Sequence, residues 1–189
     1  MKKIPCLFAA AAALLVITSM PVLAEDPLRV DVEKLGQIKF AAPENPTERK
    51  YLGLAGSGEF KLTDVQGKYI IIEVFSMYCP ICQREAPKVN KVHGLIAKNS
   101  AHSETVKLVG IGTGNTPFEV DVFRRKYSVP FPLFPDDNFL IQRVFSQQVK
   151  TPTFIIVKNL GKKGLELVDL RVGPLDSAET FSKNLPLAP

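Results

Sequence analysis

Tyr69-Ile-Ile-Ile-Glu-Val-Phe75 is an apolar run with one charge, and Ser-Met-Tyr followed by Cys79-Pro80-Ile81-Cys82 comes directly after it. A continuous apolar run of this kind predicts a central strand that is covered on both faces. The polar segment that follows predicts a helix that begins at Cys79. Free backbone N–H groups and the positive end of the helix dipole favour a thiolate there. The segment therefore predicts a dithiol–disulfide redox site.

The N-terminus has the pattern of a secretory signal peptide. Lys2 and Lys3 supply a positive start, residues 6–17 are apolar without interruption, and Val22-Leu23-Ala24 supplies short side chains before Glu25. The apolar run is shorter than the roughly 20 residues that span a bilayer. We therefore expect a signal peptide over 1–24, cleavage near Ala24 and a periplasmic or secreted mature protein. An uncleaved membrane anchor is the alternative.

Cleavage would leave two of the three cysteines, because it removes Cys6. Exported proteins meet an oxidising compartment, in which disulfides persist. A disulfide between Cys79 and Cys82 closes a very short loop and constrains the unfolded chain little. The pair is therefore better suited to switching between dithiol and disulfide than to bracing the fold.

Charge and metal-ligating residues exclude two function classes. Without Lys2 and Lys3, the 24 basic residues become 22 against 19 acidic ones, an excess of three that does not predict a nucleic-acid partner. A structural zinc site needs four ligands, and only His93 and His102 are available to join the two cysteines. Neither spacing forms a second ligand pair, so we expect no metal and no other cofactor.

Helices and strands are predicted to alternate along the remaining chain. Residues 25–58 form an N-terminal arm ahead of a domain over 59–189, and within this arm 47–57 read as a short strand and a Gly-rich turn. The domain has a helix over 79–99, a strand over 106–112, a helix from Thr116-Pro117 to 127, an edge strand within 129–135, a short helix capped by 136–138, a strand pair at 154–157 and 165–172, and a helix over 177–185. This order predicts an α/β sandwich with a mixed sheet.

Three features occur in the order of a known fold: Cys79-Pro-Ile-Cys82 after a buried strand, an extra strand–helix unit over 106–127, and Thr151-Pro152 before the strand–hairpin–strand–helix ending. On these features residues 60–185 resemble a thioredoxin-fold protein. They are most similar to the secreted thiol–disulfide oxidoreductases related to TlpA and ResA. The resemblance implies a thioredoxin-like three-layer sandwich with a mixed central sheet and an inserted strand–helix unit.

The resemblance also implies roles for individual residues. Cys79 is the attacking thiolate and Cys82 resolves the mixed disulfide. Pro152, in a cis bond, places the backbone of Thr151 beside the sulfurs, where it pairs with a substrate strand. Tyr78 stands where the family usually has tryptophan, and we expect it to contact substrate. The implied partners are client proteins with cysteines and a membrane or soluble protein that recharges the site of a monomeric enzyme.

Two acids are candidate proton handlers. Glu73 lies six residues before Cys79, at the position of the buried acid of thioredoxins, and burial in a strand would raise its pKa into the range that suits acid–base work. Glu85 lies three residues after Cys82, matching the Cys-x-x-Cys-x-x-Glu pattern of ResA-like proteins. The alternative is that Glu73 faces solvent and that Glu85 is an ordinary acid of the first helical turns.

The direction of electron flow stays open at this point, since residues between the cysteines tune the reduction potential. The architecture favours a reductase, whereas Pro80 directly after Cys79 is also found in disulfide-forming proteins of the DsbA type. Two further functions share the fold. A copper metallochaperone of the Sco type usually has three residues between its cysteines and a distant histidine. A peroxiredoxin-like peroxidase has Thr or Ser where this chain has Ser76, but proline where it has Ile72.

Overall fold

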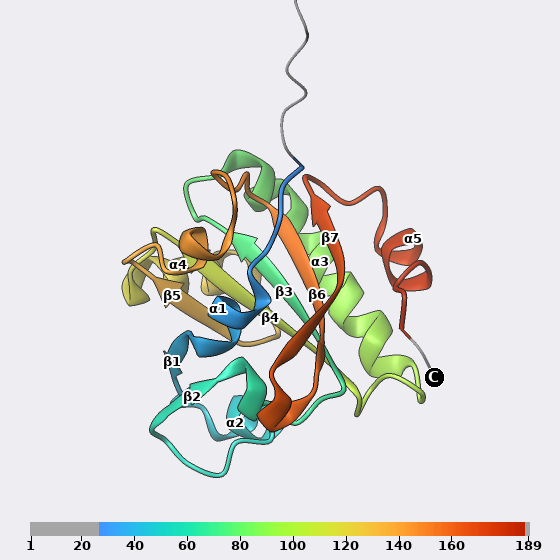
Figure 1. Cartoon of the computed structure of the whole chain (residues 1–189). Helices are drawn as coiled ribbons and strands as arrows, with labels where there is room; N and C mark the ends of the chain where they lie inside the picture. The colour runs from blue at the N-terminus through green and yellow to red at the C-terminus, as the bar shows by residue number, and fades with distance from the viewer. Residues whose placement is uncertain (1–26, 188–189) are drawn as a thin grey trace, which may run out of the picture.

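The structure is a computed structural model that describes residues 27–187, so the predicted signal peptide and Cys6 lie outside the described residues. Five strands form a mixed sheet in the order β5-β4-β3-β6-β7 (Figure 1). The strands are β3 (Tyr69–Phe75), β4 (Val106–Thr113), β5 (Leu133–Asp136), β6 (Thr153–Asn159) and β7 (Leu165–Val172). β4 runs parallel to β3 and β5 parallel to β4, whereas β6 pairs antiparallel with both β3 and β7. The predicted mixed sheet and the strand pair are confirmed.

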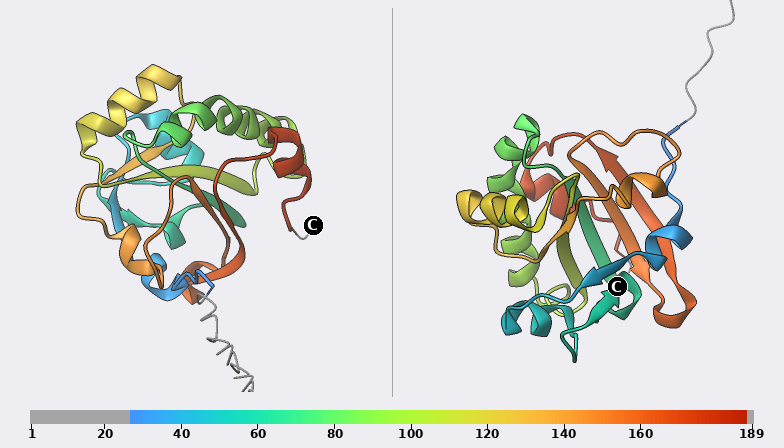
Figure 2. Two further views of the ribbon diagram at one scale, coloured as in Figure 1. Left: turned by 90° about the horizontal axis from the view of Figure 1, so that it is seen from above. Right: turned by 90° about the vertical axis from the view of Figure 1, so that its left-hand side faces the viewer.

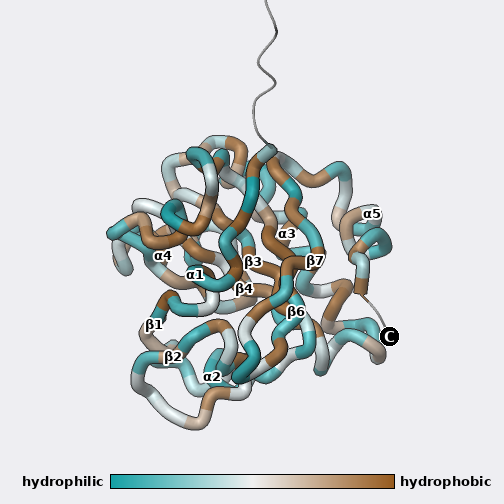
Figure 3. Tube along the Cα trace, in the orientation of Figure 1, coloured by the Kyte–Doolittle hydropathy of each residue, from teal (hydrophilic) through white to brown (hydrophobic). Residues whose placement is uncertain are grey.

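Helices α3 (Pro80–Lys98), α4 (Pro117–Tyr127) and α5 (Ala178–Lys183) cover one face of the sheet (Figure 2). β3 is buried along its whole length, and its side chains alternate between two cores. Ile71 and Phe75 pack with α3, α4 and α5, whereas Ile70 and Ile72 belong to the second core on the other face. The central strands accordingly carry much of the apolar colouring in Figure 3. Glu73 shares the parity of Ile71 and Phe75, so it points toward α3.

The N-terminal segment builds the second core. It contains α1 (Val32–Gln37), β1 (Lys39–Ala41) and α2 (Pro46–Leu52), and β1 pairs antiparallel with β2 (Glu59–Lys61). Leu35, Phe40 and Leu52 are buried in the same cluster as Ile70 and Ile72 of β3. Residues 35–52 therefore pack on the sheet, and the predicted domain boundary at residue 58 stays a prediction.

The predicted strand within 47–57 is wrong, because α2 is a helix. Asn45 caps it through Oδ1, which accepts a hydrogen bond from the backbone N–H of Thr47 at 2.9 Å, and Pro46 occupies the first turn. The helix ends at Gly53, whose φ of 72° is the left-handed conformation that glycine adopts without strain. These start and stop signals outweigh the β propensity of Tyr51.

Helices are present where the sequence predicts them at 116–127 and 177–185. Thr116 caps α4 and Ser177 caps α5. The short helix predicted after Asp136 is instead a 3₁₀ turn at Ile141–Val144, and the Asp136 carboxylate accepts from the backbone N–H groups of Leu140 and Ile141 at its start. Among the helices within residues 27–187, none has the length and apolarity to cross a membrane.

Candidate functional site

Cys79 lies at the junction of β3 and α3, where the sequence predicts the helix to begin. It is the N-cap residue of α3, with extended backbone, and Pro80 occupies the first helical turn. The backbone N–H of Cys82 donates to Cys79 Sγ at 3.3 Å. The sulfur thus takes the place that a serine or aspartate oxygen takes in other N-caps, where it satisfies a free N–H of the helix.

The loop before β6 reaches the same sulfur. The Thr151–Pro152 peptide bond is cis, and the carbonyl oxygen of Thr151 lies 3.2 Å from Cys79 Sγ, to which the thiol donates. Cys79 is partly exposed, whereas Cys82 is fully buried one turn into the helix, and both are free thiols. The structure thus brings together the two cysteines and the Thr151-Pro152 pair.

The two thiols differ in acidity. Burial raises the pKa of the Cys79 thiol, but hydrogen bonds with the Thr151 side chain and with Cys82 lower it by more, so the net shift is downward. Burial raises the pKa of the Cys82 thiol strongly, and its contact with Cys79 adds to this rise. Since the thiolate is the nucleophile, Cys79 is the thiol of the pair that ionises first and is open to attack.

Glu73 is buried on the side of β3 that α3 covers, with 2% of its surface exposed. Burial is the main cause that raises its pKa to about 8, and the charges of Glu85 and Cys79 add to it. Within residues 27–187, no hydrogen-bond partner lies against its Oε1. The alternative of a solvent-facing acid is therefore wrong. At pH 7 this carboxyl is mostly protonated.

Glu85 is also buried, in the part of α3 that follows Cys82. Its Oε1 lies 3.0 Å from the Lys88 ammonium, and its Oε2 accepts a hydrogen bond from the backbone N–H of Leu175 at 2.9 Å. Lys88 also donates to the carbonyl oxygen of Leu175. The carboxylate therefore ties α3 to the segment that leads into α5.

Asn115 is a residue of this region that the sequence interpretation missed. It is fully buried, its Oδ1 accepts from the backbone N–H of Met77 at 2.8 Å, and its Nδ2 donates to Ser76 Oγ at 3.4 Å. It follows β4, the parallel neighbour of β3. Because the carboxyl ends of parallel strands meet at one edge of a sheet, a polar residue there was the available signal.

Tyr78 directly precedes Cys79, and its side chain reaches α4. Its side chain is 65% exposed, and its hydroxyl donates to the carboxylate of Glu119 in the first turn of α4. Glu119 also accepts from the backbone N–H of Thr116, in a capping box. The structure thus links the turn before Cys79 to α4, the helix of the inserted strand–helix unit.

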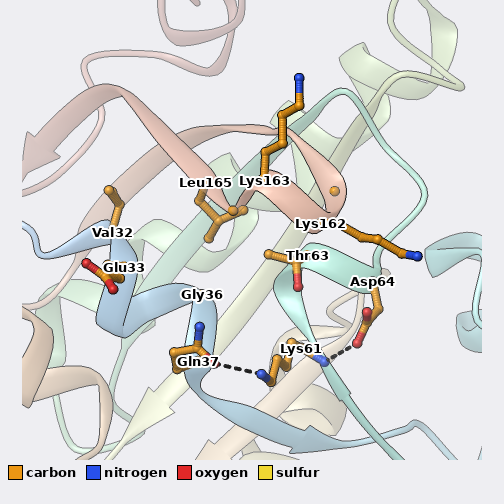
Figure 4. Close-up of a pocket in the computed structure, with 12 residues that line it drawn as sticks. Val32, Glu33, Gly36, Gln37, Lys61, Thr63, Asp64, Lys162, Lys163 and Leu165 are labelled. Carbon is orange, nitrogen blue, oxygen red and sulfur yellow. Dashed lines mark hydrogen bonds between the residues drawn. The ribbon is translucent and has the colours of Figure 1, made fainter.

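His93 lies between the rings of Tyr51 and Phe131, at centroid distances of 5.7 Å and 5.8 Å, and burial lowers its pKa. Over residues 27–187, no cluster of three or more His, Cys, Asp or Glu side chains has a metal-holding arrangement. A cavity of about 820 Å³ is lined by α1, Lys61, Asp64 and the β6–β7 turn, without any of the predicted site residues (Figure 4).

Comparison of the sequence with known proteins identifies relatives of this chain. The model of the AhpC/TSA family matches residues 40–182. Thiol-disulfide oxidoreductase ResA of Geobacillus thermodenitrificans is 25% identical over 101 residues, which are 53% of this chain and 55% of that protein. ResA of Geobacillus kaustophilus is 24% identical with the same coverage. The chain therefore spans about half the length of the curated relatives it matches.

Solved structures share the fold. A secreted Mycobacterium tuberculosis disulfide oxidoreductase, homologous to E. coli DsbE, has a TM-score of 0.56 and 20% identity, covering 81% of this chain and 96% of that chain. StoA from Bacillus subtilis has a TM-score of 0.52 and 19% identity, covering 67% of this chain and 88% of that chain. At these identities the likeness shows the fold, and the predicted thioredoxin-like architecture is confirmed.

Proposed function

The chain belongs to the AhpC/TSA family, and from this premise we propose that it is an exported thiol–disulfide oxidoreductase that exchanges disulfides with cysteines of client proteins. The observation that carries the proposal is the contrast between the two thiols. Cys79 is partly exposed at the N-cap of α3 with a lowered pKa, whereas Cys82 is buried beneath it with a raised pKa. One thiol is ready to attack, and the other is held back until a mixed disulfide forms.

The exchange proceeds in two steps that balance in atoms and electrons. The Cys79 thiolate attacks one sulfur of a client disulfide, the client S–S bond breaks, and the other client sulfur leaves as a thiolate. Cys82 then loses its proton and attacks Cys79 Sγ, which releases the second client thiolate and leaves a Cys79–Cys82 disulfide. The client gains two electrons and the site loses two. The same steps in reverse oxidise a client dithiol.

Glu73 is our candidate for the proton exchange with Cys82. Its carboxyl is buried on the α3 side of β3, and its pKa of about 8 lies close enough to neutrality to take and return a proton. Glu85, held by Lys88 and the Leu175 N–H, raises that pKa through its charge. Thr151 and Pro152 are the proposed contacts for a client strand, with Tyr78 at the rim of the site.

Trapping tests the proposal. In the Cys82→Ser variant the second step is blocked, so a peptide with an intramolecular disulfide should remain covalently attached to Cys79, visible by mass spectrometry of the unreduced protein. Cys79→Ser should form no such adduct and should lose exchange. If wild-type protein fails to exchange with the peptide and Cys82→Ser captures none, the proposed function is wrong.

We further propose cleavage near Ala24, export, a monomeric enzyme, a separate protein that recharges the site, and the reductase direction. The overall architecture supports the reductase direction, against the single proline that follows Cys79. A reduction potential near that of thioredoxin, about −270 mV, is the expected result, and one near −120 mV would reverse the assignment. No observation on residues 27–187 favours the copper metallochaperone or the peroxidase. His93 is packed between rings, and the Ser76 hydroxyl accepts from Asn115.

A further inference from the structure

We propose that Asn115 is a positioning residue for Cys79, acting through the turn Ser76–Tyr78 that carries the chain from β3 into α3. The inference rests on the proposed role of Cys79 as the attacking thiol. Asn115 does not touch the sulfur. It determines where the sulfur lies.

The side chain of Asn115 is committed entirely to this turn. Its acceptor takes the Met77 N–H at 2.8 Å, and its donor reaches Ser76 Oγ at 3.4 Å, with none of the residue exposed. Its own backbone is fixed from two sides, since its N–H donates to the carbonyl of Gly112 and its carbonyl accepts from the N–H of Asp136. The backbone of Asn115 is therefore held at the ends of β4 and β5, while its side chain binds the turn after β3.

The turn transmits this hold to the thiol. The Met77 peptide is gripped from both sides, because its N–H goes to Asn115 and its carbonyl accepts from Gln83 Nε2 at 2.7 Å. The Cys79 N–H then donates to the carbonyl of Ser76 at 3.1 Å. This places Cys79 in the N-cap position, where its sulfur meets the Cys82 N–H. Each bond in the series fixes the next.

A second contact from the same segment supports the inference. Glu119, four residues after Asn115, binds the hydroxyl of Tyr78, and its other oxygen caps α4 at Thr116. The β4–α4 connection thus holds Met77 through Asn115 and Tyr78 through Glu119. Both residues immediately before Cys79 are therefore bound to the β4–α4 connection.

A merely structural role for Asn115 is the competing explanation, and the chain offers a matched control. Asn159 is a half-buried asparagine whose Nδ2 donates to the carbonyl of Val65 at 2.8 Å and whose Oδ1 accepts from the N–H of Gly161 at 2.9 Å. It ends β6, which begins at Thr153 beside the site, so it lies about 20 Å along the strand from that end. Its loss would weaken the fold without reaching Cys79.

The test is the pH dependence of alkylation of Cys79 by iodoacetamide, followed by mass spectrometry of the peptide that contains it, in full-length wild type, Asn115→Ala and Asn159→Ala. Loosening the turn weakens the hydrogen bonds that favour the thiolate. We expect the midpoint of Asn115→Ala to rise by about half a pH unit or more, which lowers the rate at pH 7 roughly threefold. Asn159→Ala should keep the wild-type midpoint of alkylation, although it should unfold at a lower urea concentration than wild type.

A folded Asn115→Ala protein with the wild-type midpoint would overturn the inference, as would an equal shift in Asn159→Ala. If Asn115→Ala does not fold, Asn115→Ser provides the same comparison, since its shorter hydroxyl cannot hold both Met77 and Ser76. The readout needs no client. If the wild-type protein fails in disulfide exchange, only the proposed function is contradicted. If the wild type is active but the alkylation midpoint of the Asn115 variants is unshifted, only the positioning role is contradicted.

Discussion

Replacing Glu73 with glutamine keeps the shape of a buried side chain but removes its ability to ionise. The carboxyl has an ordinary pKa of 4.5 and a folded-state pKa raised to about 8, chiefly by burial. Between these values the folded protein keeps a proton that the unfolded chain has released. Stability from this group is therefore fully present below pH 4.5 and is lost as the pH rises through about 8.

The size of the effect follows from the same two values. The interval from 4.5 to about 8, at 1.36 kcal/mol per pKa unit, corresponds to about 5 kcal/mol. We expect the free energy of unfolding of wild type, relative to Glu73→Gln, to fall by an amount of this order between pH 4 and pH 9. The glutamine variant should gain most over wild type at alkaline pH, because wild type must then bury a carboxylate.

Urea unfolding at about five pH values measures this difference directly, since every other titrating group is common to both proteins. Glu104→Gln is the control, because Glu104 is exposed and its replacement should leave the pH profile parallel to that of wild type. A difference between wild type and Glu73→Gln that stays constant from pH 4 to pH 9 would refute the argument that burial holds Glu73 protonated.

Three further outcomes are expected. Leu52→Ala should cost about 2–5 kcal/mol of unfolding free energy, since Leu52 is fully buried in the second core, and a loss below 1 kcal/mol would mean that the N-terminal segment is not part of that core. Asn45→Ala should cost about 1 kcal/mol by removing the cap of α2, whereas Asn45→Asp should cost little; equal losses would contradict the capping role. Alkylation of Cys79 in wild type should have a midpoint below the ordinary thiol value of about 8.5, and a midpoint at or above it would remove the argument from the helix N-terminus.

The parts of the fold that the sequence predicted well are those with dense local signals. β3 is a continuous apolar run and was placed at its observed bounds, and α4 begins at a Thr-Pro cap. The sequence interpretation predicts a strand where α2 is a helix, because the local start signal of Asn45-Pro46 outweighs the β propensity of Tyr51.

The site divides in the same way. The two cysteines lie close together in the sequence, so their redox chemistry can be predicted from it. The burial of Glu73 can be predicted from its position in the apolar run of β3. Asn115 was not predicted, because its partner Met77 lies 38 residues away and meets it only through the parallel pairing of β3 with β4. The bond from Leu175 to Glu85 spans 90 residues and has no local signature at all.

The hydrogen bond between the Leu175 N–H and the Glu85 carboxylate sets the order in which the site is completed. A chain that is made or threaded from its N-terminus presents Cys79, Cys82 and Glu85 when barely half of its length has emerged. The N–H of Leu175 that meets the Glu85 carboxylate arrives only near the end. A polypeptide that ends before residue 175 has both thiols, but its Glu85 carboxylate has only Lys88 as a partner and lacks the Leu175 N–H. The candidate site is therefore completed only after all five strands of the sheet, which end at Val172, have had the opportunity to pair.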